Sequence, residues 1–174
     1  MKIQKILKRL LQLHPKSVDL SLDRIKRLLK DLDNPEKKIT NAIQVVGTNG
    51  KYSFCSTLRE IFETAGYTVN MNISPSLRKF NERYYLTGKY ISDDQLHDLL
   101  IEVEKINHDQ NITFHEFICA CFFLAAASFS GYIEWHRKQV PGEIVPIPPS
   151  SYALPCLTGS LLCAVGSSLN VQNV

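Results

Sequence analysis

The amino-acid sequence predicts an α/β fold in which a P-loop-type parallel sheet is flanked by helices. Two observations support this class. A short apolar run at residues 42–46 enters a glycine-rich turn, and a helical pattern and a second short run follow it. Apolar residues also recur at helical spacing on both sides of this unit. With 174 residues, 44% of them apolar and 21% charged, the composition is that of one globular domain.

Two amphipathic helices are predicted near the N-terminus. Residues 3–11 place Ile and Leu at intervals of three and four before Pro15, and residues 22–32 repeat the pattern. Residues 1–40 also hold eleven Lys or Arg against five Asp or Glu, in a chain of net charge +3. These cations alternate with leucines rather than aromatic residues. We therefore interpret them as a solvated helix face and expect no nucleic-acid partner, although a basic nucleic-acid-binding domain is an alternative.

The central segments predict one βαβ unit. Residues 42–46 (AIQVV) are apolar and β-branched, as in a buried parallel strand, and residues 51–65 return to a helical pattern. Residues 67–71 (YTVNM) alternate like a second strand, so the crossover between the strands is expected to be right-handed. Residues 72–83 are polar and broken by Pro75, which predicts a long functional loop.

Two further helices each begin at a capping box, in which a hydroxyl and a longer polar side chain satisfy exposed backbone N–H groups. The first box pairs Ser92 with Gln95, and the second pairs Thr113 with Glu116. The run FICACFFLAAA at residues 117–127 is apolar on all sides. We therefore expect the second helix to be buried on almost all of its sides.

The character of the chain changes after residue 128. Five of the eight prolines lie there, and Glu143 is the only charged residue from position 142 onwards. No helical or alternating pattern places this part on the core. We therefore expect residues 1–128 to form a domain and residues 129–174 a non-homologous, poorly structured tail.

The five cysteines have no regular spacing and are odd in number, which favours a reducing compartment, and we expect a cytoplasmic protein. Lys5, Lys8 and Arg9 interrupt what would be the apolar part of an export signal. No stretch reaches the roughly 20 apolar residues of a membrane-spanning helix. No membrane partner is expected.

The segment GTNGKYS at residues 47–53, called the glycine loop below, suggests phosphate binding. A strand that runs into glycines, a lysine and a hydroxyl at a helix start lets backbone N–H groups surround a phosphate. The pattern GxxxxGK[ST] is not met, because its first Gly would fall on Val45 and its hydroxyl residue on Tyr52. A plain turn with an incidental lysine is the alternative.

Residues 10–127 resemble the N-terminal part of the folylpolyglutamate synthase and dihydrofolate synthase family, within the Mur ligase superfamily. The segments that carry the resemblance are LSLDRIKRLL at 20–29, GTNGKYS against the family's GTNGKGS, ISPSL at 73–77 against SPHL, FNER at 80–83 and TFHEF at 113–117. The resemblance covers about the first 128 residues and none of the tail.

The resemblance implies the N-terminal portion of a Mur-ligase-like, ATP-binding domain and an acid–amino-acid ligase of folate and one-carbon metabolism. In that reaction ATP phosphorylates the carboxylate of a folate or pteroate, and the amine of L-glutamate displaces the phosphate. ATP and Mg2+ are the implied cofactors. A non-catalytic nucleotide-binding remnant is the alternative function. Oligomeric state is left open.

The resemblance also implies roles for individual residues. The positions that would hold the ATP phosphates are Gly47, Thr48, Asn49, Gly50, Lys51 and Ser53, with Lys51 neutralising the transferred phosphoryl group as the catalytic residue. Ser74 and Glu116 would bind Mg2+. Glu116 could instead serve only its capping box, and Ser74 an ordinary turn. The FNER segment would lie near the folate, or its charges could be merely solvated.

Two residues depart from the family pattern, and its later segments are not recognised after Ser128. Tyr52 replaces a Gly, where its ring could occupy space wanted by phosphate, and Ser76 replaces a His. A glycine-rich segment, further strands and a C-terminal domain are missing from the pattern. We therefore expect a truncated and impaired ligase, as a frameshift would produce, whose helix at 114–127 is left uncovered.

Overall fold

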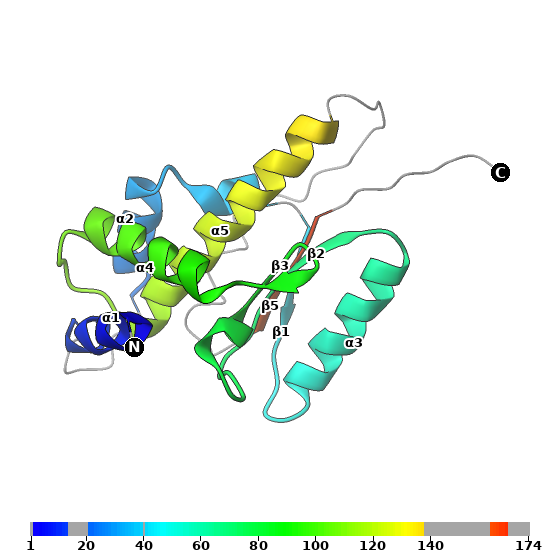
Figure 1. The fold of residues 1–174 in the computed structure, drawn as a ribbon, viewed down its shortest axis with the longest axis horizontal. Coiled ribbons are helices and arrows are strands. Elements are labelled where there is room, and N and C mark those ends of the chain that lie inside the picture. Colours follow the sequence, from blue (N-terminus) through cyan, green and yellow to red (C-terminus); the bar gives the residue numbers. More distant parts are fainter. Residues whose placement is uncertain (1, 14–20, 40, 138–160, 167–174) are drawn as a thin grey trace.

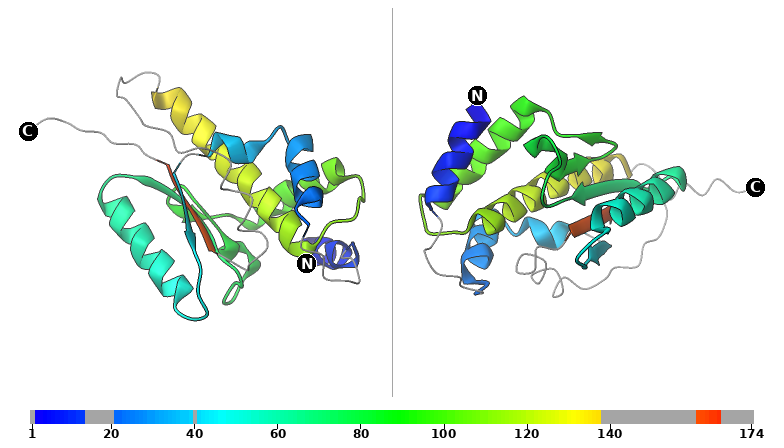
Figure 2. Two further views of the ribbon diagram at one scale, coloured as in Figure 1. Left: turned by 180° about the vertical axis from the view of Figure 1, so that it is seen from behind. Right: turned by 90° about the horizontal axis from the view of Figure 1, so that it is seen from below.

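The computed structural model describes residues 2–13, 21–39, 41–137 and 161–166, with backbone elements alone for 129–137 and 161–166. Its elements are α1 (Lys2–Gln12), α2 (Asp23–Asp31), the 3-10 helix η1 (Pro35–Lys38), β1 (Ala42–Val45), α3 (Lys51–Thr64), β2 (Thr68–Asn72), the 3-10 helix η2 (Phe80–Arg83), β3 (Tyr84–Leu86), β4 (Lys89–Tyr90), α4 (Asp93–Asn107), α5 (Phe114–Arg137) and β5 (Leu161–Gly166). The sheet lies between two unequal layers (Figures 1 and 2). On one side are α1, α2, α4 and α5, and on the other is α3.

The strand order is β1-β5-β2-β3-β4, and every neighbouring pair is antiparallel. Because β1 and β2 both run against β5, they run parallel to each other with β5 between them. The predicted α/β class is confirmed. Neighbouring strands are nevertheless antiparallel rather than parallel, because the strand between β1 and β2 comes from residues 161–166.

The region after residue 128 contributes more than the sequence predicts. Helix α5 continues to Arg137, and β5 places Ala164 opposite both Ala42 and Asn70. The short apolar run LLCAVG had no local signal to distinguish it, because strand formation depends on partners remote in sequence. The rest of the expected tail, residues 138–160 and 167–174, lies outside the described residues.

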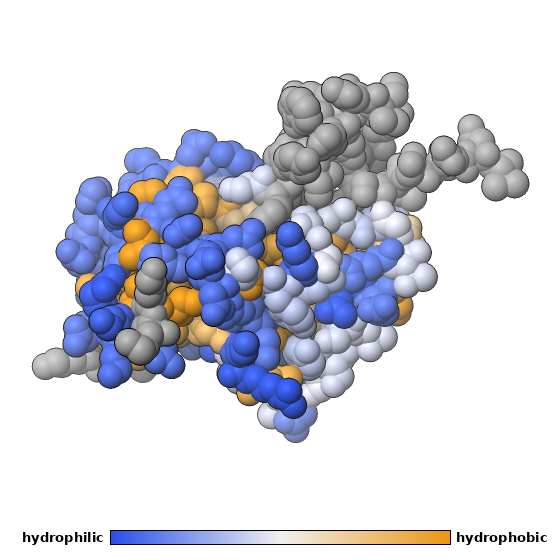
Figure 3. All heavy atoms as spheres, in the orientation of Figure 1, coloured by the Kyte–Doolittle hydropathy of each residue, from blue (hydrophilic) through white to orange (hydrophobic). Residues whose placement is uncertain are grey.

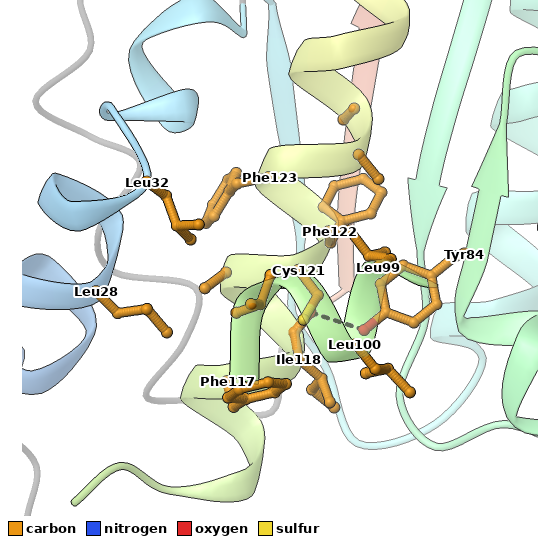
Figure 4. Packing of buried hydrophobic residues seen from close by; sticks show 14 of the residues in the cluster. Leu28, Leu32, Tyr84, Leu99, Leu100, Phe117, Ile118, Cys121, Phe122 and Phe123 are labelled. Atoms are coloured by element: carbon orange, nitrogen blue, oxygen red, sulfur yellow. Dashed lines mark hydrogen bonds between the residues drawn. The ribbon is translucent and has the colours of Figure 1, made fainter. Parts of the chain in front are cut away.

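The larger core, called the helical core below, joins α1, α2, α4 and α5 to β3. Its fully buried side chains include Leu28, Leu100, Phe117 and Phe122 (Figure 4). Tyr84 also lies there, and its hydroxyl donates to the carbonyl of Ile118 at 2.9 Å. The expectation of an uncovered helix at 114–127 is wrong, since α5 packs against α2, α4, η1 and β3.

The smaller core, called the sheet core below, lies between α3 and the sheet. It consists of Cys55, Val69, Met71, Ile73 and Tyr85. Cys55 is the buried residue of α3, and burial raises the pKa of its thiol to about 11.

The outer side of α3 carries exposed apolar side chains. Phe54 is 57% exposed and Ile61 is 58% exposed. On the face shown in Figure 3, polar side chains surround the apolar ones that reach the surface over the helical half. Within the described part of the chain, no helix combines the length and apolar character needed to cross a membrane.

Candidate phosphate-binding site

The glycine loop joins the end of β1 to the start of α3 and is exposed from Val46 to Gly50. Gly50 is the N-cap of α3 and has φ of 76°, a left-handed conformation that favours glycine. No side chain caps this helix end. The first N–H groups of α3 therefore have no partner within the helix, and they are available to an anion.

Lys51 folds back over the loop. Its Nζ donates to the carbonyl of Gly47 and, at 3.1 Å, to the carbonyl of Thr48. The predicted phosphate ligands from Gly47 to Lys51 are thus brought together, and Ser53 lies exposed in the first turn of α3. A cation and several backbone donors converge at this end of the helix, which is the chemistry that a phosphate requires.

Tyr52 turns towards the β3–β4 hairpin. It is hydrogen-bonded to Tyr90 of β4, whose pKa is raised by burial and then by this hydrogen bond. The ring of Tyr90 packs edge-on against Tyr85, with 5.2 Å between ring centroids. Tyr52 therefore lies along the flank of α3 that faces the hairpin.

Arg59 and Glu63 extend this contact along the same side of α3. The Arg59 guanidinium lies 4.5 Å from the Tyr85 ring centroid, and its Nε lies 3.5 Å from a Glu63 carboxylate oxygen. The Tyr85 hydroxyl donates to Glu63 at 2.8 Å. Burial, followed by this bond, raises the pKa of Tyr85 to about 12. Tyr52, Arg59, Glu63, Tyr85 and Tyr90 form what we call the tyrosine cluster, which braces the glycine loop's helix on the hairpin.

Sequence reasoning missed the tyrosine cluster. The spacing of Tyr52, Arg59 and Glu63 does place them on one side of a helix. Their partners on the hairpin follow only from the tertiary structure, because the hairpin lies more than twenty residues away in the sequence.

The loop after β2 is ordered by its own charged residues. Glu82 accepts hydrogen bonds from the backbone N–H groups of Leu77 at 2.7 Å and Arg78 at 2.9 Å. These bonds, that from Arg78 first, lower the pKa of Glu82. Arg83 donates from Nη1 to the Ser74 hydroxyl at 3.1 Å. The FNER charges are therefore engaged in structure rather than merely solvated.

Glu116 is 3% exposed and serves its capping box. One carboxylate oxygen accepts from the Thr113 N–H at 2.8 Å and from Arg24 Nε at 3.1 Å. The Glu116 N–H donates in return to the Thr113 hydroxyl at 3.2 Å. The capping role that the sequence allowed for Glu116 is confirmed.

The two residues predicted to bind Mg2+ already have protein partners, although Oε1 of Glu116 is buried with no hydrogen-bond partner among the described residues. The Ser74 hydroxyl and the Glu116 carboxylate are each bonded to an arginine, whose charge opposes a nearby cation. Among the described residues, no group of three or more His, Cys, Asp or Glu side chains could hold a metal ion.

Known proteins similar to this chain are dihydrofolate synthases and folylpolyglutamate synthases. The Bacillus subtilis dihydrofolate synthase/folylpolyglutamate synthase is 39% identical over 114 residues, which are 62% of this chain and 26% of that protein. The Lacticaseibacillus casei folylpolyglutamate synthase is 31% identical over 131 residues, 71% of this chain and 28% of that protein. No protein-family model matches the chain.

Solved structures agree with the sequence comparison. Escherichia coli FolC in complex with DHPP and ADP superposes with a TM-score of 0.66 at 28% identity, over 72% of this chain and 30% of that one. This chain matches the N-terminal part of the folylpolyglutamate and dihydrofolate synthase family. The folylpolyglutamate synthetase from Lactobacillus casei gives a TM-score of 0.62 at 27% identity, over 79% of this chain and 34% of that one.

The match to the family is partial. The chain spans about a quarter of the length of the curated relatives it matches. The comparisons show the fold of the matched residues and their similarity to folylpolyglutamate synthases, which are ATP-dependent ligases. The activity and substrates of a whole synthase do not.

Proposed function

We propose that the glycine loop binds the phosphates of ATP and that this chain supplies the nucleotide-binding part of a folate-type ligase. The observation that carries the proposal is the open N-terminus of α3 beside Lys51, with Gly50 in the left-handed conformation. The ADP bound in the similar FolC structure supports it.

The proposed reaction joins glutamate to the carboxylate of a folate or pteroate. A carboxylate is a poor electrophile, so the γ-phosphoryl group of ATP is first transferred to its oxygen, giving an acyl phosphate and ADP. The glutamate amine then attacks the acyl carbon, the C–N bond forms, and phosphate leaves. In this scheme Lys51 and the first N–H groups of α3 hold the negative charge of the transferred group.

A second candidate function is nucleotide binding without ligation. The observation that favours it is that the two predicted metal ligands, the Ser74 hydroxyl and the Glu116 carboxylate, are each bonded to an arginine. ATP binding without glutamate addition would distinguish this function from the ligase.

The test is an equilibrium titration of the full chain with ATP, beside Lys51→Ala and Tyr52→Gly. Lys30→Ala is the matched control, because Lys30 is exposed on α2 and its loss changes net charge equally. We expect wild type, Lys30→Ala and Tyr52→Gly to bind and Lys51→Ala to bind at least roughly tenfold more weakly. Equal binding by Lys51→Ala and wild type would refute the site. Binding by Tyr52→Gly alone would show that tyrosine closes it.

A further inference from the structure

One flank of α3 is apolar and exposed in the part of the chain that the structure describes. Phe54, Leu58, Ile61 and Ala65 follow one another at intervals of four, three and four residues, and we call them the α3 stripe. Each interval is about one helical turn, so these side chains share one flank. Phe54 and Ile61 are 57% and 58% exposed. On this side of the sheet α3 is the helix drawn in Figures 1 and 2.

The α3 stripe lies on the opposite flank of α3 from the tyrosine cluster. The tyrosine cluster contacts the β3–β4 hairpin at one end of the strand order, and β1 lies at the other end. The α3 stripe therefore faces the β1 side of the sheet. There Ile43 and Val45 of β1 are only partly buried against the sheet core, and the neighbouring Val46 is 67% exposed. The sheet core is thus incompletely covered on the β1 side.

The two edge strands of the sheet differ in their protection. Strand β4 carries the charged Lys89, whereas β1 (AIQV) has no charged residue and no proline. Among the described strands, β1 pairs with β5 alone. Alternate residues of β1 therefore direct their N–H and C=O groups away from β5. Charged residues on an edge strand normally prevent its pairing with another chain, so a neutral edge beside an apolar flank indicates an interaction surface.

The charges of α3 indicate which partner fits this surface. The α3 stripe has no cation for a lipid surface or a nucleic acid, and Thr57 and Thr64 border it. In a two-fold contact between copies, like charges must not meet, and neither the α3 stripe nor β1 has any. Lys51 begins α3, and Glu60 and Glu63 lie in its second half. An antiparallel copy therefore places the basic end of one helix beside the acidic end of the other, which also suits the helix dipoles.

We propose that two copies of this chain form a two-fold symmetric dimer, in which the α3 stripes pack antiparallel and the β1 edges meet beside them. The intervals of four and three are those of the a and d positions in a coiled-coil seam. Burial of Phe54 and Ile61 removes apolar surface from water, which favours association. The contact requires no nucleotide, so this proposal is independent of the function proposed for the glycine loop.

The test measures the dimer dissociation constant of the full chain by sedimentation velocity over a concentration series. We expect the mass of wild type to rise from that of one chain to that of two. Ile61→Lys places a charge on each side of the contact and should weaken the dimer at least roughly tenfold, as should Phe54→Lys. Leu11→Lys is the matched control, because Leu11 on α1 is 57% exposed, and it should change the constant by less than about twofold.

Two checks accompany these variants. Ile61→Leu keeps an apolar side chain at the contact and should retain the dimer. Circular dichroism of dilute samples, in which single chains prevail, verifies that each variant folds. A wild-type chain that stays single at every concentration overturns the proposal and leaves the α3 stripe to another segment of this chain or to a different protein. A dimer that Ile61→Lys and Phe54→Lys leave unchanged also overturns it, as does growth beyond two chains.

A second measurement uses the wild-type chain alone. Hydrogen exchange followed by mass spectrometry compares a dilute sample with a concentrated one. We expect peptides that cover residues 42–46 and 54–65 to exchange more slowly in the concentrated sample, because the contact buries them, and peptides from α1 and α4 to be unchanged. Protection that concentration adds to α1 or α4 instead would place the contact elsewhere and overturn the proposal.

Discussion

The helical core and the sheet core differ in how they are held. Four helices and β3 enclose the helical core, whereas α3 covers the sheet core with Cys55 as its buried residue. The glycine loop belongs to the thinner side. The tyrosine cluster holds its helix to the hairpin, beside the apolar contacts of the sheet core. The larger apolar core therefore lies in one layer, and the candidate phosphate site lies in the other.

The largest expected effect breaks the helical core. Phe117→Ala removes a ring that is 0% exposed and should lower the free energy of unfolding by about 3–5 kcal/mol. Phe54→Ala, on the exposed side of α3, should change it by less than about 0.5 kcal/mol. Urea unfolding followed by circular dichroism measures both. Similar losses would mean that the two layers do not differ as described.

A smaller effect is expected at the buried ion pair of the helical layer. Glu116→Ala leaves Arg24 and the Thr113 N–H without their acceptor and should cost about 2–3 kcal/mol. Glu116→Gln should cost less, because its amide oxygen still accepts from Thr113. Denaturant unfolding gives the values. Stabilisation of wild type by Mg2+ that Glu116→Gln abolishes would contradict the structural role.

A double-mutant cycle tests whether Tyr52 and Tyr90 of the tyrosine cluster interact. Tyr52→Phe and Tyr90→Phe each remove one hydroxyl of the same hydrogen bond and should each cost about 0.5–1 kcal/mol. The double variant should be little worse than either single one. Additive losses in thermal unfolding would show that the two hydroxyls do not interact.

The smallest effect is local and depends on pH. The pKa of Glu82 is lowered by its bonds to backbone N–H groups, so the charged carboxylate is favoured in the folded chain. Its contribution is present above the ordinary glutamate pKa of about 4.3 and is lost as pH falls through the lowered value. The protection of the Leu77 and Arg78 N–H groups, taken relative to the intrinsic exchange rate at each pH, should therefore fall in that acidic window. It should be low throughout in a Glu82→Ala variant, which has no acceptor. Wild-type protection that does not fall in this window would contradict the prediction.

Structural features that depend on contacts between residues close in the sequence were predicted correctly. The capping box of Ser92 with Gln95 and that of Thr113 with Glu116 both form. The first strand and helix of the βαβ unit were placed within a residue or so of their observed bounds. Such features depend on contacts between residues close in the chain, so periodicity and capping chemistry suffice to find them.

Features that join distant segments came from the tertiary structure. The insertion of β5 between β1 and β2, the hydrogen bond of Tyr52 with Tyr90, and the ion pair of Arg24 with Glu116 all connect segments far apart in the sequence. The sequence by itself determined which residues face a helix flank or end a helix. It could not decide whether Arg83 would meet a carboxylate or only a hydroxyl, because a buried charge takes its cost and its use from the groups that the fold packs around it.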